Sequence, residues 1–369
     1  MKPKPITLVL ILLPLILSTP LFSQVVPIYE KYANDTIIPP VRQIVRIMFY
    51  NVENLYDPSN DSLTLDDEFT PGGLNHWSNS RFYKKLFYLA KTIIAAGDEE
   101  PPAIVGMCEI ENLRVLQKLT GQSPLKRFGY RIVHHDSPDL RGVDVALIYR
   151  PEIFTLLSWK TFRIRFPFDS TLQTREILLV KGLIFQHDTI NLLVNHWPSR
   201  RGGYAESQPK RNHVASVLKK ISDSLQKSNP WTSIIIMGDL NDEPGDESIA
   251  SYLEAKTPWQ KIQEQDLVNL MEWHKKAGKG TIKYKEIWSV FDQFIISGNL
   301  FKGTNGIKAT QDDARIFNAP FLTQPDLVNL DVKLKRTYAG PRYIGGFSDH
   351  LPVTIDLRRF QLKVYPSKQ

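Results

Sequence analysis

Acidic and amide side chains recur in this sequence directly after short apolar segments. Glu109 follows the apolar residues 104–108, and Asp239 and Asn241 follow the apolar run 234–236. Loops held at strand ends by a rigid scaffold are where proteins usually present reactive groups. A carboxylate that ends an apolar strand also needs a cation or a hydrogen-bond partner. These positions are therefore candidates for metal binding or proton transfer, although each alone could be an ordinary turn residue.

Two histidines occupy similar positions. His196 ends a predicted strand at 190–195, and His350 follows Asp349 just before a predicted terminal strand at 353–357. A lone histidine is more often structural than catalytic, but two at strand ends, in a chain with several strand-end carboxylates, favour catalysis. Oxygen-rich ligand sets suit Mg²⁺, Mn²⁺ or Ca²⁺, whereas a zinc site would ask for more histidine or cysteine. The chain has no glycine-rich phosphate loop and no G-x-S-x-G motif, which argues against ATP chemistry and serine hydrolysis.

Short apolar segments alternate with amphipathic helices along the chain. Residues 82–93 and 214–225 carry apolar side chains at helical spacing. Strands are predicted at residues 44–50, 103–108, 143–149, 177–185, 189–194, 233–237 and 294–296. Because neighbouring strands can form hairpins while helices cover the sheets, the pattern favours an α/β (α+β) fold of two packed sheets over a doubly wound parallel sheet.

Five short motifs occur in one order over residues 44–358. They are Phe-Tyr-Asn-Val-Glu-Asn around Asn51, Gly-Met-Cys-Glu-Ile-Glu-Asn around Glu109, Asn-His-Trp-Pro-Ser around His196, Gly-Asp-Leu-Asn-Asp at 238–242, and Ser-Asp-His at 348–350. Together they resemble the endonuclease/exonuclease/phosphatase superfamily, which includes deoxyribonuclease I, sphingomyelinases and inositol polyphosphate phosphatases. The resemblance implies a four-layered α/β sandwich, with two packed mixed β-sheets flanked by helices.

The resemblance also implies a metal and phosphate site. Glu109 resembles the principal metal ligand of the family, and Asn51 and Asp349 resemble residues that complete or support the cation and phosphate site. The implied cofactor is Mg²⁺, with Mn²⁺ or Ca²⁺ as alternatives. Asp239 and Asn241 resemble the pair that orients the attacking water and holds the transition-state oxygens.

A histidine and an aspartate resemble the remaining catalytic pair. His350 resembles the histidine that faces the scissile phosphate, and Asp292, in Val-Phe-Asp-Gln-Phe, resembles the carboxylate that hydrogen-bonds it. His196 resembles the second histidine of the deoxyribonuclease and sphingomyelinase branches. The apurinic-site endonucleases have asparagine there, so this histidine points away from a repair enzyme. Our candidate for the partner of His196 is Asp144.

Arginines are further candidates for phosphate binding. Arg175 resembles the arginine that contacts phosphate in the deoxyribonuclease branch. Arg141 lies where relatives often present a tyrosine or an asparagine, so its role is open. Arg200 and Arg201 follow His196 in a basic loop, which is either a rim for a polyanionic substrate or a solvated turn.

These features predict an exported, metal-dependent phosphoric ester hydrolase. We expect an endonuclease or related phosphodiesterase that acts by in-line attack of water, with nucleic acid or another phosphodiester as its partner. A phosphoinositide phosphatase or a sphingomyelinase-like phospholipase C is the alternative enzyme. A non-catalytic binding protein is disfavoured because every expected acidic and histidine position is filled. We expect a monomer, and the choice between DNA, RNA and lipid substrates stays open.

The N-terminal residues predict export. Lys2 and Lys4 precede the apolar run 6–17, an order typical of a secretory signal peptide over residues 1–23. An uncleaved membrane anchor is the alternative, but it would need about 20 apolar residues. The destination would be the periplasm or the extracellular space.

The rest of the chain reads as one catalytic domain. We predict a tether at 24–42, the domain at 43–360 and a C-terminal tail at 361–369. The single cysteine, Cys108, excludes an intramolecular disulfide, so stability must come from a hydrophobic core. The formal net charge of +7 suits a polyanionic substrate, but many ordinary surfaces carry as much.

Overall fold

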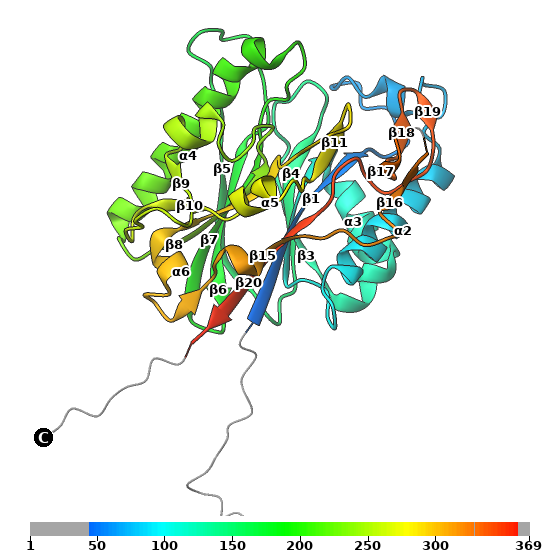
Figure 1. Cartoon of the computed structure of the whole chain (residues 1–369). Helices are drawn as coiled ribbons and strands as arrows, with labels where there is room; N and C mark the ends of the chain where they lie inside the picture. The colour runs from blue at the N-terminus through cyan, green and yellow to red at the C-terminus, as the bar shows by residue number, and fades with distance from the viewer. Residues whose placement is uncertain (1–43, 328, 361–369) are drawn as a thin grey trace, which may run out of the picture. The chain divides into compact units, whose positions relative to one another are not determined.

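The computed structural model describes residues 44–327 and 329–360 (Figure 1). The expected signal peptide at 1–23, tether at 24–42 and tail at 361–369 all lie outside the described residues. Within the described part, none of the helices has both the length and the apolar content needed to cross a membrane.

Two mixed β-sheets form the centre of the fold. The first has the strand order β14-β20-β1-β2-β4-β3, with β15 paired to β20, and the second has the order β5-β6-β7-β8-β13-β10-β9. The first sheet consists of β1 (Ile44–Leu55), β2 (Ile104–Ile110), β3 (Arg131–His134), β4 (Asp144–Tyr149), β14 (Ile307–Lys308), β15 (Ala314–Ile316) and β20 (Val353–Arg359). The second consists of β5 (Thr155–Phe162), β6 (Ile177–Ile184), β7 (Asp188–His196), β8 (Ser233–Asp239), β9 (Ala255–Lys256), β10 (Leu267–Asn269) and β13 (Asp292–Ser297).

Helices cover the outer face of each sheet. Helices α2 (Asn79–Ala95) and α3 (Leu113–Gln122) pack on the first sheet, and α4 (Tyr204–Ser228) packs on the second (Figure 1). The two shorter helices are α5 (Glu272–Lys276) and α6 (Gly298–Lys302). Short helical turns occur at Asp67–Phe69, Pro124–Phe128, Ser248–Tyr252 and Gln311–Asp313. The predicted four-layered α/β sandwich is therefore confirmed.

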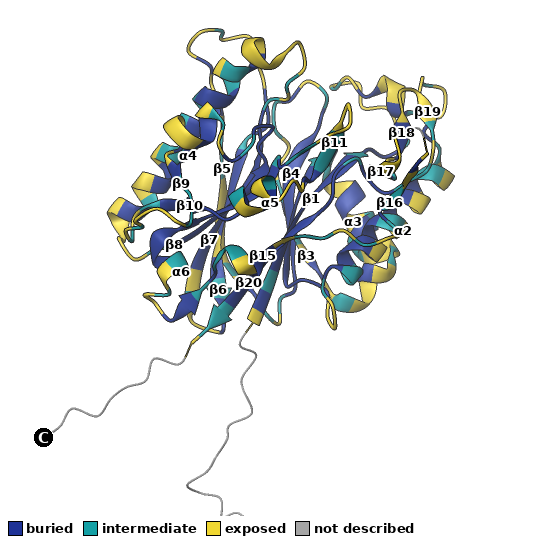
Figure 2. Cartoon of the chain, viewed as in Figure 1, coloured by how far each residue is buried: buried dark blue, intermediate teal, exposed yellow. Residues whose placement is uncertain are grey.

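Alternation along the central strands explains the layers. In β8, Ile235 and Met237 belong to the core between the sheets, while Ile234 and Ile236 pack beneath α4. Successive side chains of a strand point to opposite faces, so a strand covered on both faces reads as a continuous apolar run. Burial is accordingly concentrated in the strands, and the outer helix faces are exposed (Figure 2).

The edge strand β5 is absent from the strands predicted by sequence. Its residues are mostly exposed, and it lacks the apolar run that marks the central strands. Three two-stranded hairpins were also not predicted, for the same reason. They are β11 (Ile282–Tyr284) with β12 (Ile287–Ser289), β16 (Thr323–Asp326) with β17 (Asp331–Leu334), and β18 (Tyr338–Ala339) with β19 (Arg342–Tyr343).

Candidate active site

Strand pairing brings three of the predicted catalytic residues into one row. In the parallel pair β7–β8, His196 lies opposite Asp239, and in the antiparallel pair β8–β13, Asp239 lies opposite Asp292. In the other sheet, Asn51 of β1 lies opposite Cys108 of β2. The candidate site thus forms where these strand ends of the two sheets meet.

His350 is held by a buried carboxylate. Its Nδ1 lies 2.6 Å from Oδ2 of Asp292, whose backbone N–H donates to Thr281 Oγ1 at 3.1 Å. Burial alone would lower the pKa of His350, but the charges of Asp292 and Asp239 outweigh it and raise that pKa well above the usual value. The two carboxylates therefore favour the protonated imidazole, whose Nδ1 faces Asp292 and whose Nε2 lies 3.8 Å from Asp239.

Asp239 occupies the middle of the site. Its Oδ2 accepts a hydrogen bond from Asn51 Nδ2 at 3.0 Å and lies 3.8 Å from Nε2 of both His196 and His350. Its Oδ1 accepts from the backbone N–H of Asn241 at 3.0 Å. Burial raises the pKa of Asp239 to about 6, with Asp292 adding to the rise and His350 opposing it. A carboxylate with this pKa can exchange a proton near neutral pH.

The amides of Asn51 and Asn241 are fixed by local contacts. Asn51 Oδ1 accepts from the backbone N–H of Glu53 at 3.0 Å, so its Nδ2 is directed toward Asp239. Asn241 adopts a left-handed backbone with φ of 51°, and its Nδ2 donates to the carbonyl of Trp197 at 3.0 Å. In this arrangement the Asn51 amide nitrogen orients the Asp239 carboxylate, and its oxygen, which accepts one hydrogen bond, keeps a second lone pair for a cation.

Glu109 stands at an irregularity in β2. It has a φ of 62° and lies at a register shift between Cys108 and Ile110. Such bulges re-aim a side chain at the end of a strand. Its Oε2 accepts from the backbone N–H of Asn54 at 2.8 Å, and its Oε1 lies 4.0 Å from His196 Nε2. The bulge thus directs this carboxylate to the side on which His196 lies.

The Ser-Asp-His segment is tied to β1. Ser348 donates from Oγ to the carbonyl of Asn51 at 2.8 Å, which connects the C-terminal motif with the first motif. Asp349 accepts from the guanidinium of Arg336 at 3.0 Å. The loop that carries Arg336 and Asp349 therefore has a defined position beside β1.

The expected pairing of Asp144 with His196 is wrong. Asp144 accepts hydrogen bonds from the backbone N–H and the hydroxyl of Ser137, and its Oδ2 lies 3.3 Å from Nε2 of His134 on the adjacent strand β3. The register of β3 against β4 gives Asp144 this closer histidine. His196 makes no hydrogen bond through its ring within the described part of the chain, and its Nδ1 is buried. Burial and the nearby arginines lower its pKa, so the ring is neutral.

Three of the four candidate arginines already contact protein groups. Arg175 pairs with Asp139 at 3.1 Å and donates to the Trp197 carbonyl at 2.8 Å. Arg141 donates to Asn54 Oδ1 at 2.6 Å. The contacts of Arg200 are Asp242 at 3.0 Å, Asp246 at 2.5 Å and the Asn241 carbonyl at 2.8 Å. Arg200 therefore supports the loop after β8 from within, and of the two predicted rim arginines only Arg201 is exposed.

A buried ion pair behind the site was missed by sequence reasoning. Lys85 of α2 lies 4.0 Å from Glu53 and donates to Thr337 Oγ1 at 2.6 Å, and the backbone N–H of Thr337 donates to Glu53 at 2.6 Å. Burial raises the pKa of Glu53 to about 7 and lowers that of Lys85 to about 8. Neither spacing nor motif links these residues, so only the charged Lys85 on the apolar face of α2 could have indicated them.

The donor set fits the hard divalent cation that the resemblance implies. The carboxylates of Glu109, Asp239, Asp292 and Asp349 gather around the site, and the raised pKa of Asp239 reflects burial and like charge. Oxygen donors in such a cluster are what Mg²⁺ or Mn²⁺ takes. The side chain of Glu109 is 15% exposed, so this carboxylate is accessible to a cation beside the buried Asp239.

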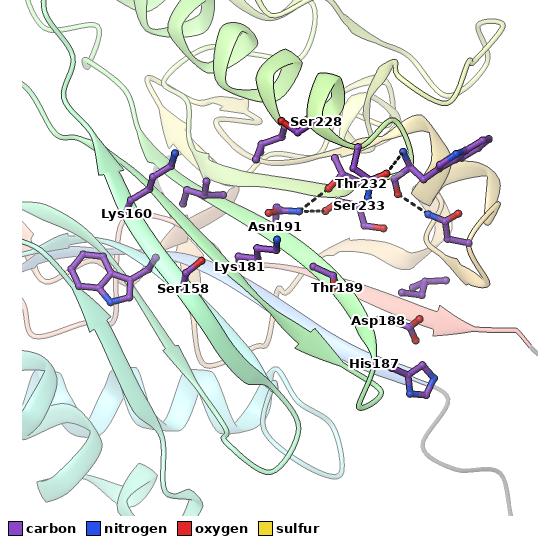
Figure 3. Close-up of a pocket in the computed structure, with 17 residues that line it drawn as sticks. Ser158, Lys160, Lys181, His187, Asp188, Thr189, Asn191, Ser228, Thr232 and Ser233 are labelled. Carbon is purple, nitrogen blue, oxygen red and sulfur yellow. Dashed lines mark hydrogen bonds between the residues drawn. The ribbon is translucent and has the colours of Figure 1, made fainter.

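A separate cavity lies far from this chemistry. It has a volume of about 570 Å³ and includes Lys160, Lys181 and Asn191 among its lining residues (Figure 3). It sits at the beginning of β7 and β8, whereas His196 and Asp239 end those strands. The amide of Asn191 already donates to Thr232 Oγ1 at 2.9 Å. The candidate catalytic residues therefore lie at the other end of the sheet.

Comparisons with known proteins agree with the fold and the motifs. A family model described as the endonuclease/exonuclease/phosphatase family matches residues 46–359. No curated protein matches the chain. Among solved structures, a protein of the same family description from Bacteroides thetaiotaomicron is 15% identical, with a TM-score of 0.53 over 87% of this chain and 99% of that chain.

Two further solved structures share the fold. TDP2 from D. rerio, complexed with a single-strand DNA product, is 13% identical, with a TM-score of 0.50 over 85% of this chain and 99% of that one. A mannosyl-6-phosphatase from Bacteroides thetaiotaomicron is 15% identical, with a TM-score of 0.51 and the same two coverages. At these sequence identities the similarity establishes the fold alone, and the substrate has to be argued from the residues of the site.

Proposed function

Because the chain belongs to the endonuclease/exonuclease/phosphatase family, we propose that it is a divalent-metal-dependent phosphodiesterase that cleaves nucleic acid by in-line attack of water. Members of this family are phosphoric ester hydrolases, so this chain is an enzyme of that class. The observation that carries the proposal is the buried pair of His350 and Asp292 beside Asp239. A proton donor and a proton acceptor lie there within one small site.

Each residue of the site has a separate role in the proposed reaction. Glu109 would hold the cation with Asn51 and Asp349 in support, and a bound cation supplies neutralisation of the phosphate oxygens. Asp239 takes the proton of the attacking water as the new oxygen–phosphorus bond forms and the ester bond opposite breaks. His350, held by Asp292, donates its Nε2 proton to the ester oxygen that leaves, so that the products are an alcohol and a phosphate.

Two features favour a phosphodiester substrate: the second histidine and an exposed arginine. His196 matches the branches of the family that cleave diesters, and Arg201 is exposed in the loop that follows it. The DNA product bound by D. rerio TDP2 is consistent with a polynucleotide substrate on this fold. The mannosyl-6-phosphatase of the same fold acts on a phosphate monoester, so hydrolysis of a monoester has to be compared with hydrolysis of a diester.

A lipid headgroup diester is the second candidate, and one observation favours it. The hairpin β11–β12 exposes Tyr284 and Ile287 near its turn, and Ile282 at its base forms an isolated β-bridge with His350. Exposed apolar side chains next to a catalytic residue suit an interfacial substrate. If the substrate is a lipid, replacing Tyr284 and Ile287 with serine should lower the hydrolysis of sphingomyelin vesicles and leave the hydrolysis of DNA unchanged. If the substrate is nucleic acid, this selective loss should not occur.

A side-by-side assay tests the proposal. The purified protein is treated with EDTA, then supplied with Mg²⁺ or Mn²⁺ and offered plasmid DNA, RNA, bis(4-nitrophenyl) phosphate, sphingomyelin and 4-nitrophenyl phosphate. We expect metal-dependent cleavage of the nucleic acids and the small diester, and loss of it in Glu109→Gln. Full activity after exhaustive chelation, or preference for the monoester, would refute the proposal.

We also propose that the enzyme is exported. The support is the order of Lys2, Lys4 and the apolar run 6–17, which is typical of a signal peptide. Cell fractionation should recover activity from the periplasm or medium, with an N-terminus near residue 24 in the recovered protein. Recovery of the uncut chain from the cytoplasm would contradict export.

A further inference from the structure

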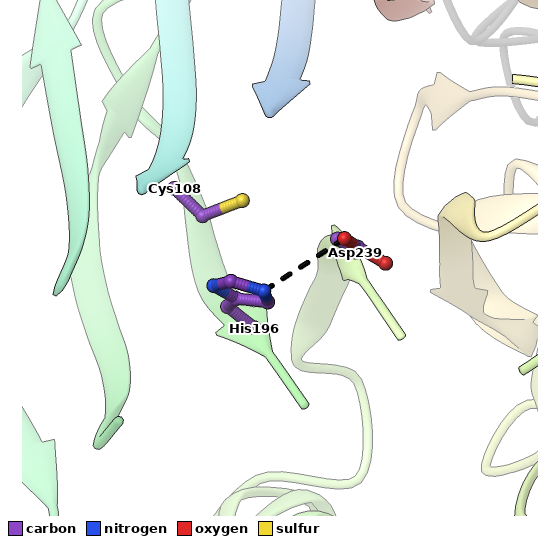
Figure 4. Close-up of side chains that lie close together, drawn as sticks. All are labelled: Cys108, His196 and Asp239. Atoms are coloured by element: carbon purple, nitrogen blue, oxygen red, sulfur yellow. Dashed lines mark ion pairs between the residues drawn. The ribbon is translucent and has the colours of Figure 1, made fainter. Parts of the chain in front are cut away.

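The only cysteine of the chain lies at the floor of the candidate active site. Cys108 ends the regular part of β2, immediately before the bulge at Glu109, and is fully buried. Figure 4 shows its sulfur beside the ring of His196 and on the side that faces Asp239. The hydrolytic roles assigned to the neighbouring residues do not use this thiol.

The imidazole of His196 lacks the partner that a buried histidine normally has. It is 5% exposed, yet neither ring nitrogen makes a hydrogen bond within the described residues, and Nδ1 is completely enclosed. Its Nε2 has only long contacts, 3.8 Å to Asp239 and 4.0 Å to Glu109. Nε2, the nitrogen that faces Asp239, is therefore the atom of this buried ring that is available to a further group.

Sulfur, nitrogen and oxygen donors of the three side chains converge. One ligand atom each from Cys108, His196 and Asp239 lies within 4.8 Å of the other two. Zinc binds sulfur at about 2.3 Å and nitrogen at about 2.0 Å, which puts two ligands of one tetrahedral ion roughly 3.3–3.6 Å apart. The 3.8 Å between His196 and Asp239 is close to that spacing, and the sulfur of Cys108 lies within 4.8 Å of both other donors.

We propose that Cys108, His196 and Asp239 form a second metal site, which binds a thiophilic divalent cation such as Zn²⁺. Thiolate and imidazole are ligands that zinc takes and magnesium avoids. The thiol of Cys108 loses its proton to solvent when the metal binds. Three protein ligands would leave one position of the usual tetrahedron for water.

Occupancy of this site competes with hydrolysis. It withdraws Asp239 from the attacking water, so Zn²⁺ inhibits the Mg²⁺-supported reaction. The inhibition rests on the proposed phosphodiesterase function, whereas the binding of zinc does not.

Cadmium provides a direct test of binding. Cd²⁺ is titrated into the full chain in the presence of Mg²⁺, and the sulfur-to-cadmium absorption band is followed in the ultraviolet. Because the chain has one cysteine, this band reports Cys108 alone. We expect one saturable equivalent, no band in Cys108→Ala, and an affinity at least about tenfold weaker in His196→Asn, which keeps the sulfur but loses the imidazole.

A matched control removes a different histidine. His134 lies in a second cluster, with Asp136 and Asp144, that contains no sulfur. His134→Gln should leave the band and its midpoint unchanged. Absence of the band in the wild-type protein, or an unchanged midpoint in His196→Asn, would overturn the proposed site. The measurement on His196→Asn remains a valid test even if Cys108→Ala fails to fold.

Inhibition is measured on the same proteins. Zn²⁺ should inhibit Mg²⁺-supported hydrolysis, and Cys108→Ala should require at least about tenfold more zinc for half inhibition while its rate without zinc stays that of the wild type. Equal zinc sensitivity in both proteins would overturn the inhibitory role. A protein that binds cadmium but hydrolyses no phosphodiester would refute the proposed function and leave the metal site standing.

Discussion

His350 carries the positive charge on which the proposed reaction depends. The charges of Asp292 and Asp239 favour its protonated form, because they outweigh the effect of burial on its pKa. We expect His350→Ala to lower kcat by about 10²- to 10⁴-fold, the usual contribution of a general acid or base. Asp292→Asn should lower it less, since the ring stays in place but loses its charged partner. Steady-state kinetics on bis(4-nitrophenyl) phosphate, with circular dichroism as a control for folding, would measure both. Wild-type turnover in His350→Ala would refute the assigned role.

We expect Asp239 to determine the acid limb of the pH profile. Its pKa is raised by burial to about 6, and the carboxylate must be ionised to take a proton from water. As pH falls through about 6 the group becomes protonated, so kcat/KM should fall there and not near the ordinary aspartate value. A profile of kcat/KM against pH at saturating Mg²⁺ measures this. A rate that stays constant down to pH 4 would contradict the role of Asp239 as the base.

The close approach of β7 and β8 holds His196 and Asp239 side by side. Gly238 lies opposite Asn195, and a Cβ at Gly238 would meet the Asn195 carbonyl oxygen at 2.4 Å. Gly238→Ala must therefore separate the strand ends that carry both residues. We expect a lower Tm and a large loss of kcat.

Gly121 provides the matched control for that substitution. It lies near the end of α3, and a Cβ there would meet nothing within 4 Å. Gly121→Ala should be neutral or stabilising by about 0.5–1 kcal/mol, because alanine favours the helix. Thermal unfolding and kinetics of both variants test the prediction, which fails if Gly238→Ala behaves like Gly121→Ala.

The two sheets share one core, which joins both halves of the described body. Phe294 of β13 is fully buried there, among residues of both sheets. We expect Phe294→Ala to lower the free energy of unfolding by about 3–5 kcal/mol, the usual cost of removing a buried phenylalanine. Phe87→Ala is the control, because that ring is 52% exposed on α2 and its loss should cost within about 0.5 kcal/mol. Urea unfolding followed by circular dichroism and by tryptophan fluorescence would measure both effects. Separate transitions for the two probes would contradict a shared core.

The family and the central strands could be predicted from sequence because their determinants are local. A strand buried on both faces is a continuous apolar run, as at 234–236, and the residues of the site follow such runs directly. Glu109, Asp239 and His196 could thus be named as candidates without knowing which strands pair. The exposed strand β5 could not be predicted, since an edge strand has no such run.

The partners of these residues were decided only by the tertiary structure. Asp144 faces His134 instead of His196, Arg200 is held by Asp242 and Asp246, and Cys108 meets His196 although 87 residues separate them in the chain. A contact between side chains depends on strand register and on how the two sheets pack, and a shift of one residue turns a side chain to the opposite face. Neither quantity is encoded in any short stretch of sequence, so the types of the catalytic groups could be read from the chain, but their pairing required the fold.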